Sequence, residues 1–174
     1  DPCYASYLQF IQCSGAKAYP MPLTQENNYM PDVEEIYHQI IKDGYKKENI
    51  KALFINYPNN PLGSSATREY VQSVINFCQK YDILLVSDAA YCDMYFTEEE
   101  KPFSIFELDG AKDIGIEFYS FSKPYAITGW RLGWVCGNKD VVQRFGKGKS
   151  TIDNGIFKAL QKACAEIINS EEGD

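Results

Sequence analysis

Apolar and polar positions along the chain follow two different periods. Three segments carry apolar residues at every third or fourth position, the spacing of an amphipathic helix: 31–43, 66–81 and about 154–169. Five shorter segments are apolar runs of the kind that forms strands: 7–13, 50–57, 83–87, 115–121 and 132–137. Because strands and helices alternate over most of the chain, the pattern predicts an α/β domain with a mainly parallel sheet.

Particular residues support these elements. Pro31 suits the first turn of the first helix, and Gly44 suits its end. In the second helix, four residues are expected to share the buried face: Val71, Val74, Ile75 and Cys78. The run at 83–87 (ILLVS) is almost continuously apolar, which indicates a strand covered by helices on both faces.

The composition limits the choice of partners. The chain has 174 residues, enough for one domain, and a formal net charge of −7 from 24 acidic and 17 basic residues. This balance does not favour a nucleic-acid backbone, which binds clustered positive charge. Apolar residues make up 45% of the chain, enough for a packed core. No apolar run approaches the roughly 20 residues of a membrane span. From the charge balance and the lack of such a run, we expect neither nucleic acid nor a membrane as partner.

Cysteine and histidine usage argues for a reducing compartment and against a metal site. The six cysteines are scattered without a CxxC pair, and His38 is the single histidine, so the sequence holds no zinc pattern. Such usage is typical of a cytoplasmic protein. The chain starts at Asp1 without an initiating methionine and stops just after a helical pattern. We therefore expect it to be a piece of a longer protein.

Polar residues stand where three of the predicted strands end. The three segments are 58–63 (PNNPLG), 88–91 (DAAY) and 120–123 (SFSK). Each alone has an ordinary structural explanation: a turn, a helix cap or a solvated lysine. However, the carboxyl ends of parallel strands meet at one edge of an open sheet, where ligands bind. The three segments together therefore predict a ligand site at that edge.

Four motifs in this order resemble the fold-type I, pyridoxal-phosphate-dependent aminotransferases (aminotransferase class I and II). Residues 59–63 (NNPLG) are similar to the family's N-P-x-G turn, with Leu62 where threonine is more usual. Residues 88–91 resemble its D-x-x-Y element, 120–123 its S-x-S-K element and 129–133 (GWRLG) its G-x-R-x-G element. The resemblance covers the whole chain. It implies a three-layer sandwich, the partial large domain of a transferase dependent on pyridoxal phosphate (PLP).

Three further stretches resemble the LL-diaminopimelate aminotransferase branch of the family: 55–61 (INYPNNP), 116–120 (IEFYS) and 152–157 (IDNGIF). The resemblance implies transfer of an amino group between an amino acid and a 2-oxo acid by a cytoplasmic homodimer. The branch points to LL-diaminopimelate as amino donor, and so to lysine biosynthesis. An amino acid of the aspartate or glutamate type is the other donor considered.

The resemblance also implies roles around PLP for the motif residues. Lys123 is expected to bond to the cofactor aldehyde through its uncharged amine and later to shuttle a proton. Asp88 is expected to face the pyridine nitrogen and to favour the protonated ring, the better electron sink. Tyr91 and Asn60 are expected to hydrogen-bond the phenolic oxygen of the ring. Lys123, Asp88 and Tyr91 are thus the expected catalytic group.

The remaining candidates are expected to hold the ring and its phosphate. Tyr4 occupies the aromatic position of the family's P-x-(aromatic) element and is expected to stack on the ring. Arg131 is expected to clamp the phosphate with its planar guanidinium, helped by the hydroxyls of Ser120 and Ser122. No residue is expected to bind a metal.

Residues 1–174 are thus interpreted as the PLP-binding core of a large domain. A further phosphate-binding turn is expected before Asp1, and a small domain with an arginine for the substrate carboxylate after Asp174. We expect the full-length protein to be the active transaminase. The 174-residue chain alone is expected to turn over little or no substrate.

Other functions stay open at the level of sequence. A β-carbon–sulfur lyase on the same scaffold would use the same Lys123 and Asp88, so the motifs do not separate the two reactions. A non-catalytic regulatory or binding module could keep both residues and sense an amino acid without converting it. A dinucleotide-binding domain is disfavoured, because no GxGxxG follows a predicted strand.

Overall fold

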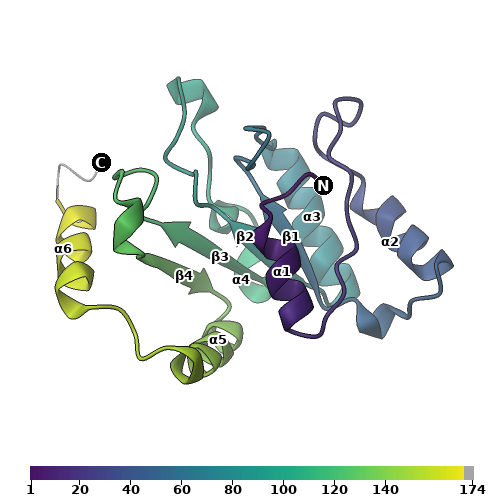
Figure 1. Cartoon of the computed structure of the whole chain (residues 1–174). Helices are drawn as coiled ribbons and strands as arrows, with labels where there is room; N and C mark the ends of the chain where they lie inside the picture. The colour runs from purple at the N-terminus through teal and green to yellow at the C-terminus, as the bar shows by residue number, and fades with distance from the viewer. Residues whose placement is uncertain (171–174) are drawn as a thin grey trace.

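A four-stranded sheet forms the centre of the molecule (Figure 1). The computed structural model describes residues 1–170, and positions 171–174 of the predicted domain lie outside the described residues. The strands follow one another in chain order: β1 (Ala52–Asn56), β2 (Leu84–Asp88), β3 (Gly115–Ser120) and β4 (Gly133–Gly137). β1, β2 and β3 pair in parallel, whereas β4 runs antiparallel to β3. The predicted α/β fold with a mainly parallel sheet is therefore confirmed.

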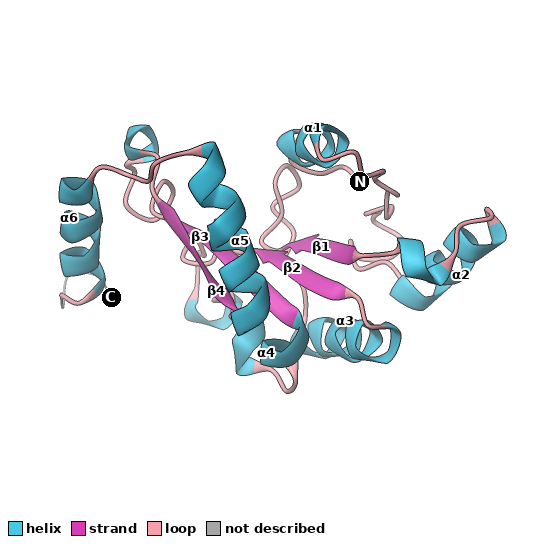
Figure 2. Cartoon of the chain, turned by 90° about the horizontal axis from the view of Figure 1, so that it is seen from below, coloured by secondary structure: helices cyan, strands magenta, loops and turns pink. Residues whose placement is uncertain are grey.

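Helices cover both faces of this sheet, and Figure 2 shows α1 and α3 on opposite sides of it. The α-helices are α1 (Ser6–Cys13), α2 (Val33–Lys42), α3 (Arg68–Tyr81), α4 (Ala111–Ile114), α5 (Lys139–Ile152) and α6 (Lys158–Ile168). The 3₁₀ turns are η1 (Lys47–Asn49), η2 (Glu98–Glu100), η3 (Ile105–Glu107) and η4 (Thr128–Trp130). The Tyr7 ring of α1 contacts Phe54 of β1. Phe145 of α5 contacts Phe118 of β3, so α1 and α5 cover the same face.

The main core lies between α3 and the sheet. All four residues of α3 that were predicted to face inward are buried: Val71, Val74, Ile75 and Cys78. They belong to one cluster with Leu85 of β2. Burying a side chain such as Val74 or Ile75 contributes about 1.5–3 kcal/mol to folding. Thr67 starts the helix, because its hydroxyl oxygen accepts a hydrogen bond from the Tyr70 N–H (3.2 Å).

The prediction of a strand at 7–13 is wrong, because this segment forms helix α1. Its apolar residues fit both periods, and a run this short does not separate them. Tyr7 and Ile11, four positions apart, lie on one side of a helix but would also share one face of a strand. In the helix that forms, the Tyr7 ring packs against Phe54 of the sheet.

Helix α5 occupies a stretch for which no element was predicted. Asn138 starts it, since its side-chain oxygen accepts hydrogen bonds from the N–H groups of Asp140 and Val141 (both 3.1 Å). The last predicted helix is confirmed, but it begins at Lys158 instead of near residue 154. Cys164 is buried on its inner side.

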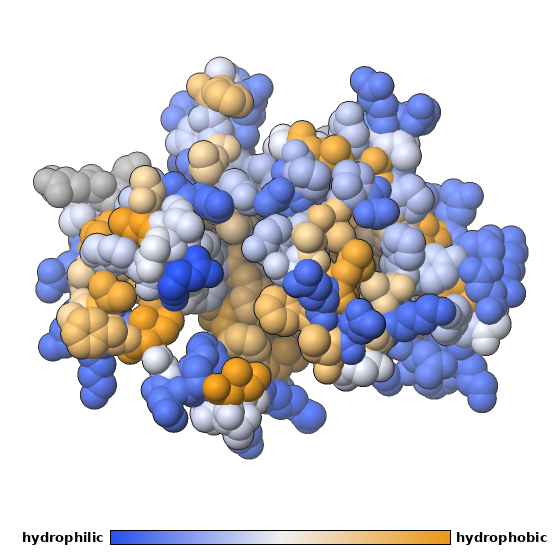
Figure 3. Space-filling model, in the orientation of Figure 1, coloured by the Kyte–Doolittle hydropathy of each residue, from blue (hydrophilic) through white to orange (hydrophobic). Residues whose placement is uncertain are grey.

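Several large apolar side chains of the helices stay exposed. They are Leu8 and Phe10 of α1, Ile41 of α2, Phe145 and Ile152 of α5, and Ile168 of α6. Figure 3 shows apolar side chains in the hollowed middle of the face that Figure 1 views. Within the described part of the chain, no helix combines the length and the apolar character of a membrane span.

Candidate functional site

Three strand ends meet at one edge of the sheet. Asn56 at the end of β1 stands in register with Asp88 at the end of β2. Asp88 in turn stands in register with Phe118 of β3, two residues before Ser120. The predicted common edge is therefore confirmed, and the loops that follow these strands start from neighbouring positions.

Asparagine side chains fasten the turn after β1 to this edge. The Asn60 N–H donates to Oδ1 of Asn56 (2.9 Å), and the Asn56 amide donates to the carbonyl of Asp88 (2.8 Å). Within the turn, Oδ1 of Asn59 accepts a hydrogen bond from the Leu62 N–H (3.1 Å). Asn56 is 6% exposed, so these bonds are shielded from water. The first two strand ends are thereby joined through one side chain.

Asn60, Tyr91 and Lys123 converge from three different loops. The Asn60 side-chain amide donates to the Tyr91 hydroxyl oxygen (3.2 Å). The Lys123 Nζ lies 5.3 Å from the centroid of the Tyr91 ring, in a cation–π arrangement. A carboxamide, a phenol and a primary amine thus meet at the edge of the sheet.

The Asp88 carboxylate is held at both oxygens. Its Oδ1 accepts a hydrogen bond from the Ala90 N–H (3.1 Å), and its Oδ2 accepts one from the hydroxyl of Tyr7 on α1. Burial and the hydrogen bond to Asp88 raise the pKa of Tyr7, so this phenol keeps its proton and stays a donor into the alkaline range. The two donors give the carboxylate a defined orientation.

Tyr4 lies beside Tyr7 at the start of the chain. The two rings meet edge to face, with 5.7 Å between their centroids. Tyr4 is 47% exposed, so part of its ring faces solvent. The predicted stacking residue is therefore linked to Asp88 through one intervening tyrosine.

Of the residues predicted to bind phosphate, Ser120 ends β3, and Ser122 and Arg131 lie on the loop between β3 and β4. The Ser122 N–H donates to Oγ of Ser120 (3.1 Å), and the Ser122 carbonyl accepts a hydrogen bond from the Thr128 hydroxyl (3.2 Å). The Arg131 Nη1 donates to the carbonyl of the same Thr128 (2.9 Å). The backbone of Arg131 is left-handed, with φ +55°. The exposed guanidinium therefore lies against its own turn, just before β4.

A large hollow lies beside β1 and borders the site at Tyr7, Asn56 and Asn59. It has a volume of about 980 Å³ and is lined mainly by apolar residues of α1, α2 and β1. It reaches Tyr7 but not Asp88 or Lys123. Its walls carry Cys3, Lys17 and Lys51, but none of the three residues expected to be catalytic (Lys123, Asp88 and Tyr91) lines it. The candidate site therefore follows the polar groups that converge at the strand ends.

Two residues of this arrangement were not among the predicted site residues. Tyr7 stands three positions after Tyr4, and the helical conformation that aims its hydroxyl at Asp88 was not predicted. Asn56 ends an apolar run and precedes prolines and asparagines, where it is readily interpreted as part of a turn. An asparagine placed in register with a strand-end aspartate is the signal that could have identified it.

Comparison with known sequences gives consistent matches over the whole chain. The family model for "Aminotransferase class I and II" matches residues 1–174. An LL-diaminopimelate aminotransferase of Halothermothrix orenii is 41% identical over 172 residues, 99% of this chain and 42% of the relative. The corresponding protein of Moorella thermoacetica is 41% identical over 174 residues, 99% of this chain and 43% of the relative. The chain thus spans less than half the length of these curated relatives.

Solved structures agree with these matches. Substrate-bound BacF from Bacillus subtilis superimposes with a TM-score of 0.87 at 35% identity, covering 98% of this chain and 41% of that chain. An aminotransferase from Staphylococcus aureus superimposes with a TM-score of 0.85 at 36% identity, covering 97% of this chain and 43% of that chain. The resemblance inferred from four short motifs is therefore confirmed, and the chain belongs to the aminotransferase class I and II family.

Proposed function

We propose that the protein carrying this chain is a PLP-dependent aminotransferase and that residues 1–174 are the cofactor-binding core of its large domain. The meeting of Asn60, Tyr91 and Lys123 at the strand end that carries Asp88 supports this most directly. PLP is the cofactor of this family. The chain covers 42% of an LL-diaminopimelate aminotransferase, so the activity is proposed for the full-length protein.

The side chains at the sheet edge fit the chemistry of PLP group by group. An amine is present for the aldehyde, a carboxylate for the ring nitrogen, a phenol and a carboxamide for the phenolic oxygen. Two hydroxyls and a guanidinium are present for the phosphate. Among the ion pairs of residues 1–170, none uses Lys123, Asp88 or Arg131. These charges are therefore not neutralised by one another and are able to meet a charged ligand.

Each residue has a definite task in the proposed reaction. The Lys123 amine acts as nucleophile and then moves a proton to and from the substrate carbon. Asp88, oriented by the Ala90 N–H and by Tyr7, holds a proton on the ring nitrogen. PLP, when bound, supplies the electron sink for the carbanion. Asn60 orients the Tyr91 hydroxyl, whose ring lies next to the Lys123 amine.

We propose that a separate group of residues binds the phosphate of the cofactor. Arg131 offers a forked guanidinium and Ser120 and Ser122 offer hydroxyls, the groups that proteins use for phosphate. Tyr4, with part of its ring exposed, is placed to stack on the cofactor ring. These contacts would hold the cofactor in place while Lys123 moves the proton to and from the substrate carbon.

We further propose that the amino donor is LL-diaminopimelate, in lysine biosynthesis. The support is the name shared by the relatives from Halothermothrix orenii and Moorella thermoacetica, each 41% identical to this chain. An aspartate- or glutamate-type donor is the alternative outcome of a substrate panel.

We propose that the full-length protein is a homodimer in the cytoplasm, without nucleic acid or membrane as partner. Ile152 and Phe157 are 84% and 71% exposed, and a second subunit seated on this segment would bury both apolar side chains. The cysteines of the chain are free, which agrees with a reducing compartment. Light scattering on the full-length protein tests the oligomeric state.

A covalent trapping experiment tests the cofactor site. PLP is added to the full-length protein, its visible absorption is recorded, and the bond is reduced with borohydride before peptide mapping. We expect the adduct on Lys123 and its loss in Lys123→Ala. Lys101→Ala is the matched control, because Lys101 also lies over a tyrosine ring (Tyr95, 5.7 Å) but outside the site. Adducts scattered over other lysines, or none, would refute the proposal.

Product analysis then separates the reactions that this site could perform. Product formation that requires a 2-oxo acid acceptor identifies an aminotransferase. Release of ammonia and a thiol identifies a β-carbon–sulfur lyase. Cofactor bound at Lys123 without turnover of any amino acid identifies a sensing module. Turnover by residues 1–174 alone would contradict the expectation that the cofactor core needs the rest of the protein.

A further inference from the structure

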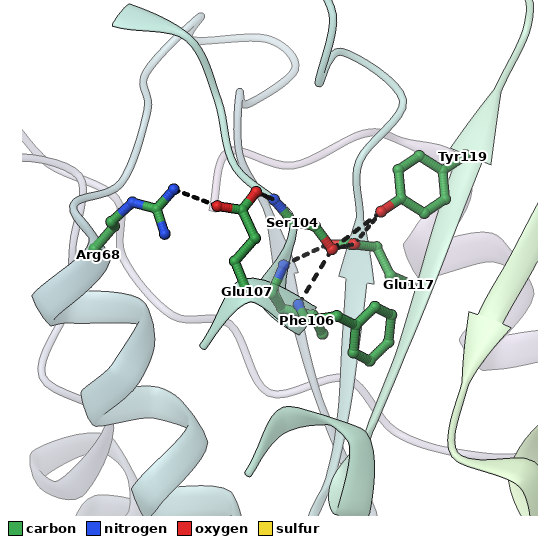
Figure 4. Close-up of polar contacts among 7 residues, drawn as sticks. Arg68, Ser104, Phe106, Glu107, Glu117 and Tyr119 are labelled. Carbon is green, nitrogen blue, oxygen red and sulfur yellow. Dashed lines mark hydrogen bonds and ion pairs between the residues drawn. The ribbon is translucent and has the colours of Figure 1, made fainter. Parts of the chain in front are cut away.

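Glu117 on β3 is a buried carboxylate that the proposed reaction does not use. It is 1% exposed. Its Oε1 accepts hydrogen bonds from the Ser87 hydroxyl (2.9 Å) and the Ile105 N–H (3.2 Å). Its Oε2 accepts hydrogen bonds from the Ser104 hydroxyl (2.6 Å) and from the Tyr119 hydroxyl. Figure 4 shows Ser104, Glu117 and Tyr119 turned toward one another.

The four donors make this an unusual way to hold a buried carboxylate. No ion pair within residues 1–170 involves Glu117, so its partners are neutral. An ionised carboxylate only accepts hydrogen bonds, and here each oxygen receives two. Because an apolar side chain would fill the same space without needing four donors, the carboxylate points to a role in arranging its partners.

Three of the four donors stand at the two ends of one loop, and the fourth, Tyr119, lies on β3 itself. Ser87 directly precedes Asp88, where β2 ends and the loop departs. Ser104 and Ile105 stand where the same loop returns and η3 begins. This loop carries Tyr91, so a single carboxylate holds both of its ends against β3.

The residues around Glu117 also contact β4 on one side and α3 on the other. Tyr119 immediately precedes Ser120, and its ring stacks on Trp134 of β4 (4.8 Å between centroids, 5° between planes). On the other side the Ser104 N–H donates to Oε1 of Glu107 (3.0 Å). Glu107 pairs with Arg68 at the start of α3. Glu117 is therefore the centre of a polar network that joins β2, β3 and α3, and the Tyr119 ring connects this network to β4 by stacking.

We propose that Glu117 is a positioning residue, which sets the place of the Tyr91 loop relative to the β3 end that leads to Lys123. It acts through Ser87 and Ser104 and touches neither Tyr91 nor Lys123. The distance it controls is the 5.3 Å between the Lys123 Nζ and the Tyr91 ring. The consequence for the cofactor rests on the proposed function, whereas the anchoring of the loop does not.

Hydrogen–deuterium exchange on the full-length protein without cofactor tests the anchoring. In Glu117→Gln we expect the amides of residues 89–104 to exchange about tenfold faster, because the NH₂ group of glutamine cannot accept the two hydrogen bonds that one carboxylate oxygen receives. The amides of β1 and α2 are expected to be unchanged. Glu34→Gln is the matched control, since Glu34 accepts hydrogen bonds from Lys80 (2.6 Å) and Tyr81 (2.8 Å) far from this loop. It is expected to leave residues 89–104 unchanged.

A spectroscopic readout tests the positioning itself. The pH midpoint of the visible band of bound PLP is measured in Glu117→Gln, in Tyr91→Phe and in the double variant. If Glu117 acts through Tyr91, the two single variants shift the midpoint in the same direction and the double variant shifts it no further than Tyr91→Phe. A role confined to general stability would leave the midpoint where it is in the wild type.

The outcomes separate the proposed function from the anchoring of the loop by Glu117. If PLP does not bind the wild type, the proposed function fails, and the exchange data still judge the anchoring. If PLP binds but residues 89–104 keep their exchange rates in Glu117→Gln, the inference is overturned. Faster exchange spread evenly over the protein would overturn it as well. Should Glu117→Gln fail to fold, Ser104→Ala removes one anchor alone and is expected to release residues 98–104 first.

Discussion

Replacing Tyr7 by phenylalanine tests whether α1 is fastened to the candidate site. The Tyr7 hydroxyl donates to Oδ2 of Asp88, a residue 81 positions away in the chain. Phenylalanine keeps the ring that packs against Tyr4 and Phe54 and removes only the hydroxyl. The substitution therefore isolates a single hydrogen bond between α1 and the end of β2.

The expected loss follows from the partial burial of this pair. A hydrogen bond to a charged group contributes about 1.5–3 kcal/mol to stability when it is shielded from water. Tyr7 and Asp88 are half-buried, so we expect Tyr7→Phe to lower the free energy of unfolding by about 1.5–2 kcal/mol. Tyr19 offers a matched control, because it donates to Oδ2 of Asp43 (2.7 Å) at the exposed surface. Tyr19→Phe is expected to leave stability unchanged within error.

The pH dependence gives a second signature of the same contact. Burial and the hydrogen bond to Asp88 raise the pKa of Tyr7 above its usual value of 10.0. Above pH 10 the unfolded chain therefore loses this proton while the folded chain keeps it. The contribution of Tyr7 to stability is complete below pH 10 and declines as the pH rises toward the folded pKa. The difference in free energy of unfolding between the wild type and Tyr7→Phe is therefore expected to become smaller at alkaline pH.

Urea unfolding followed by far-UV circular dichroism measures both effects. The cofactor-free protein and the two variants are compared at neutral pH and again above pH 10. Equal losses for Tyr7→Phe and Tyr19→Phe at neutral pH would refute the reasoning, because the buried bond would then contribute no more than the exposed one. If the difference in stability between wild type and Tyr7→Phe grew at alkaline pH, the inference that folding raises the pKa of Tyr7 would be refuted.

Three further substitutions have distinct expected outcomes. Asn56→Ala removes the side-chain partner of three backbone groups, the Asn60 N–H and the carbonyls of Pro58 and Asp88. Stability is therefore expected to fall by about 1–3 kcal/mol, and PLP to bind more weakly in an absorbance titration. Gly133→Ala places a Cβ 2.4 Å from the Tyr119 carbonyl oxygen and lowers the urea midpoint, whereas Gly129→Ala, whose Cβ meets nothing within 4 Å, does not. Val74→Ala opens a cavity in the fully buried core and costs about 2 kcal/mol in urea unfolding. Its affinity for PLP is expected to stay unchanged.

Local sequence sufficed for elements with long, regular patterns. Helix α3 was predictable because 14 residues repeat the helical period and bury one face. The segment at 7–13 was not, since so short an apolar run fits a strand and a helix equally. Helix α5 contains Gly146 and Gly148, which weaken the helical signal. The contact of Phe145 with the Phe118 ring stabilises it from outside its own sequence.

The reactive groups of the site could likewise be named from the sequence, because their chemistry and order along the chain are characteristic. Their contacts could not. Asn60 and Tyr91 lie 31 positions apart, and they touch because β1 and β2 pair in parallel with Asn56 opposite Asp88. A shift of one residue in this register would turn the strand-end side chains to the other face.

The sequence by itself determined the type of most elements, the order of the motifs and the kinds of reactive group that the protein carries. Tertiary structure alone decided that α1 brings Tyr7 to Asp88 and that Glu117 gathers both ends of the Tyr91 loop. The physical reason is that contacts between distant residues depend on sheet register and on which apolar faces are buried together. Those are properties of the packed chain, and no local pattern of residues specifies them.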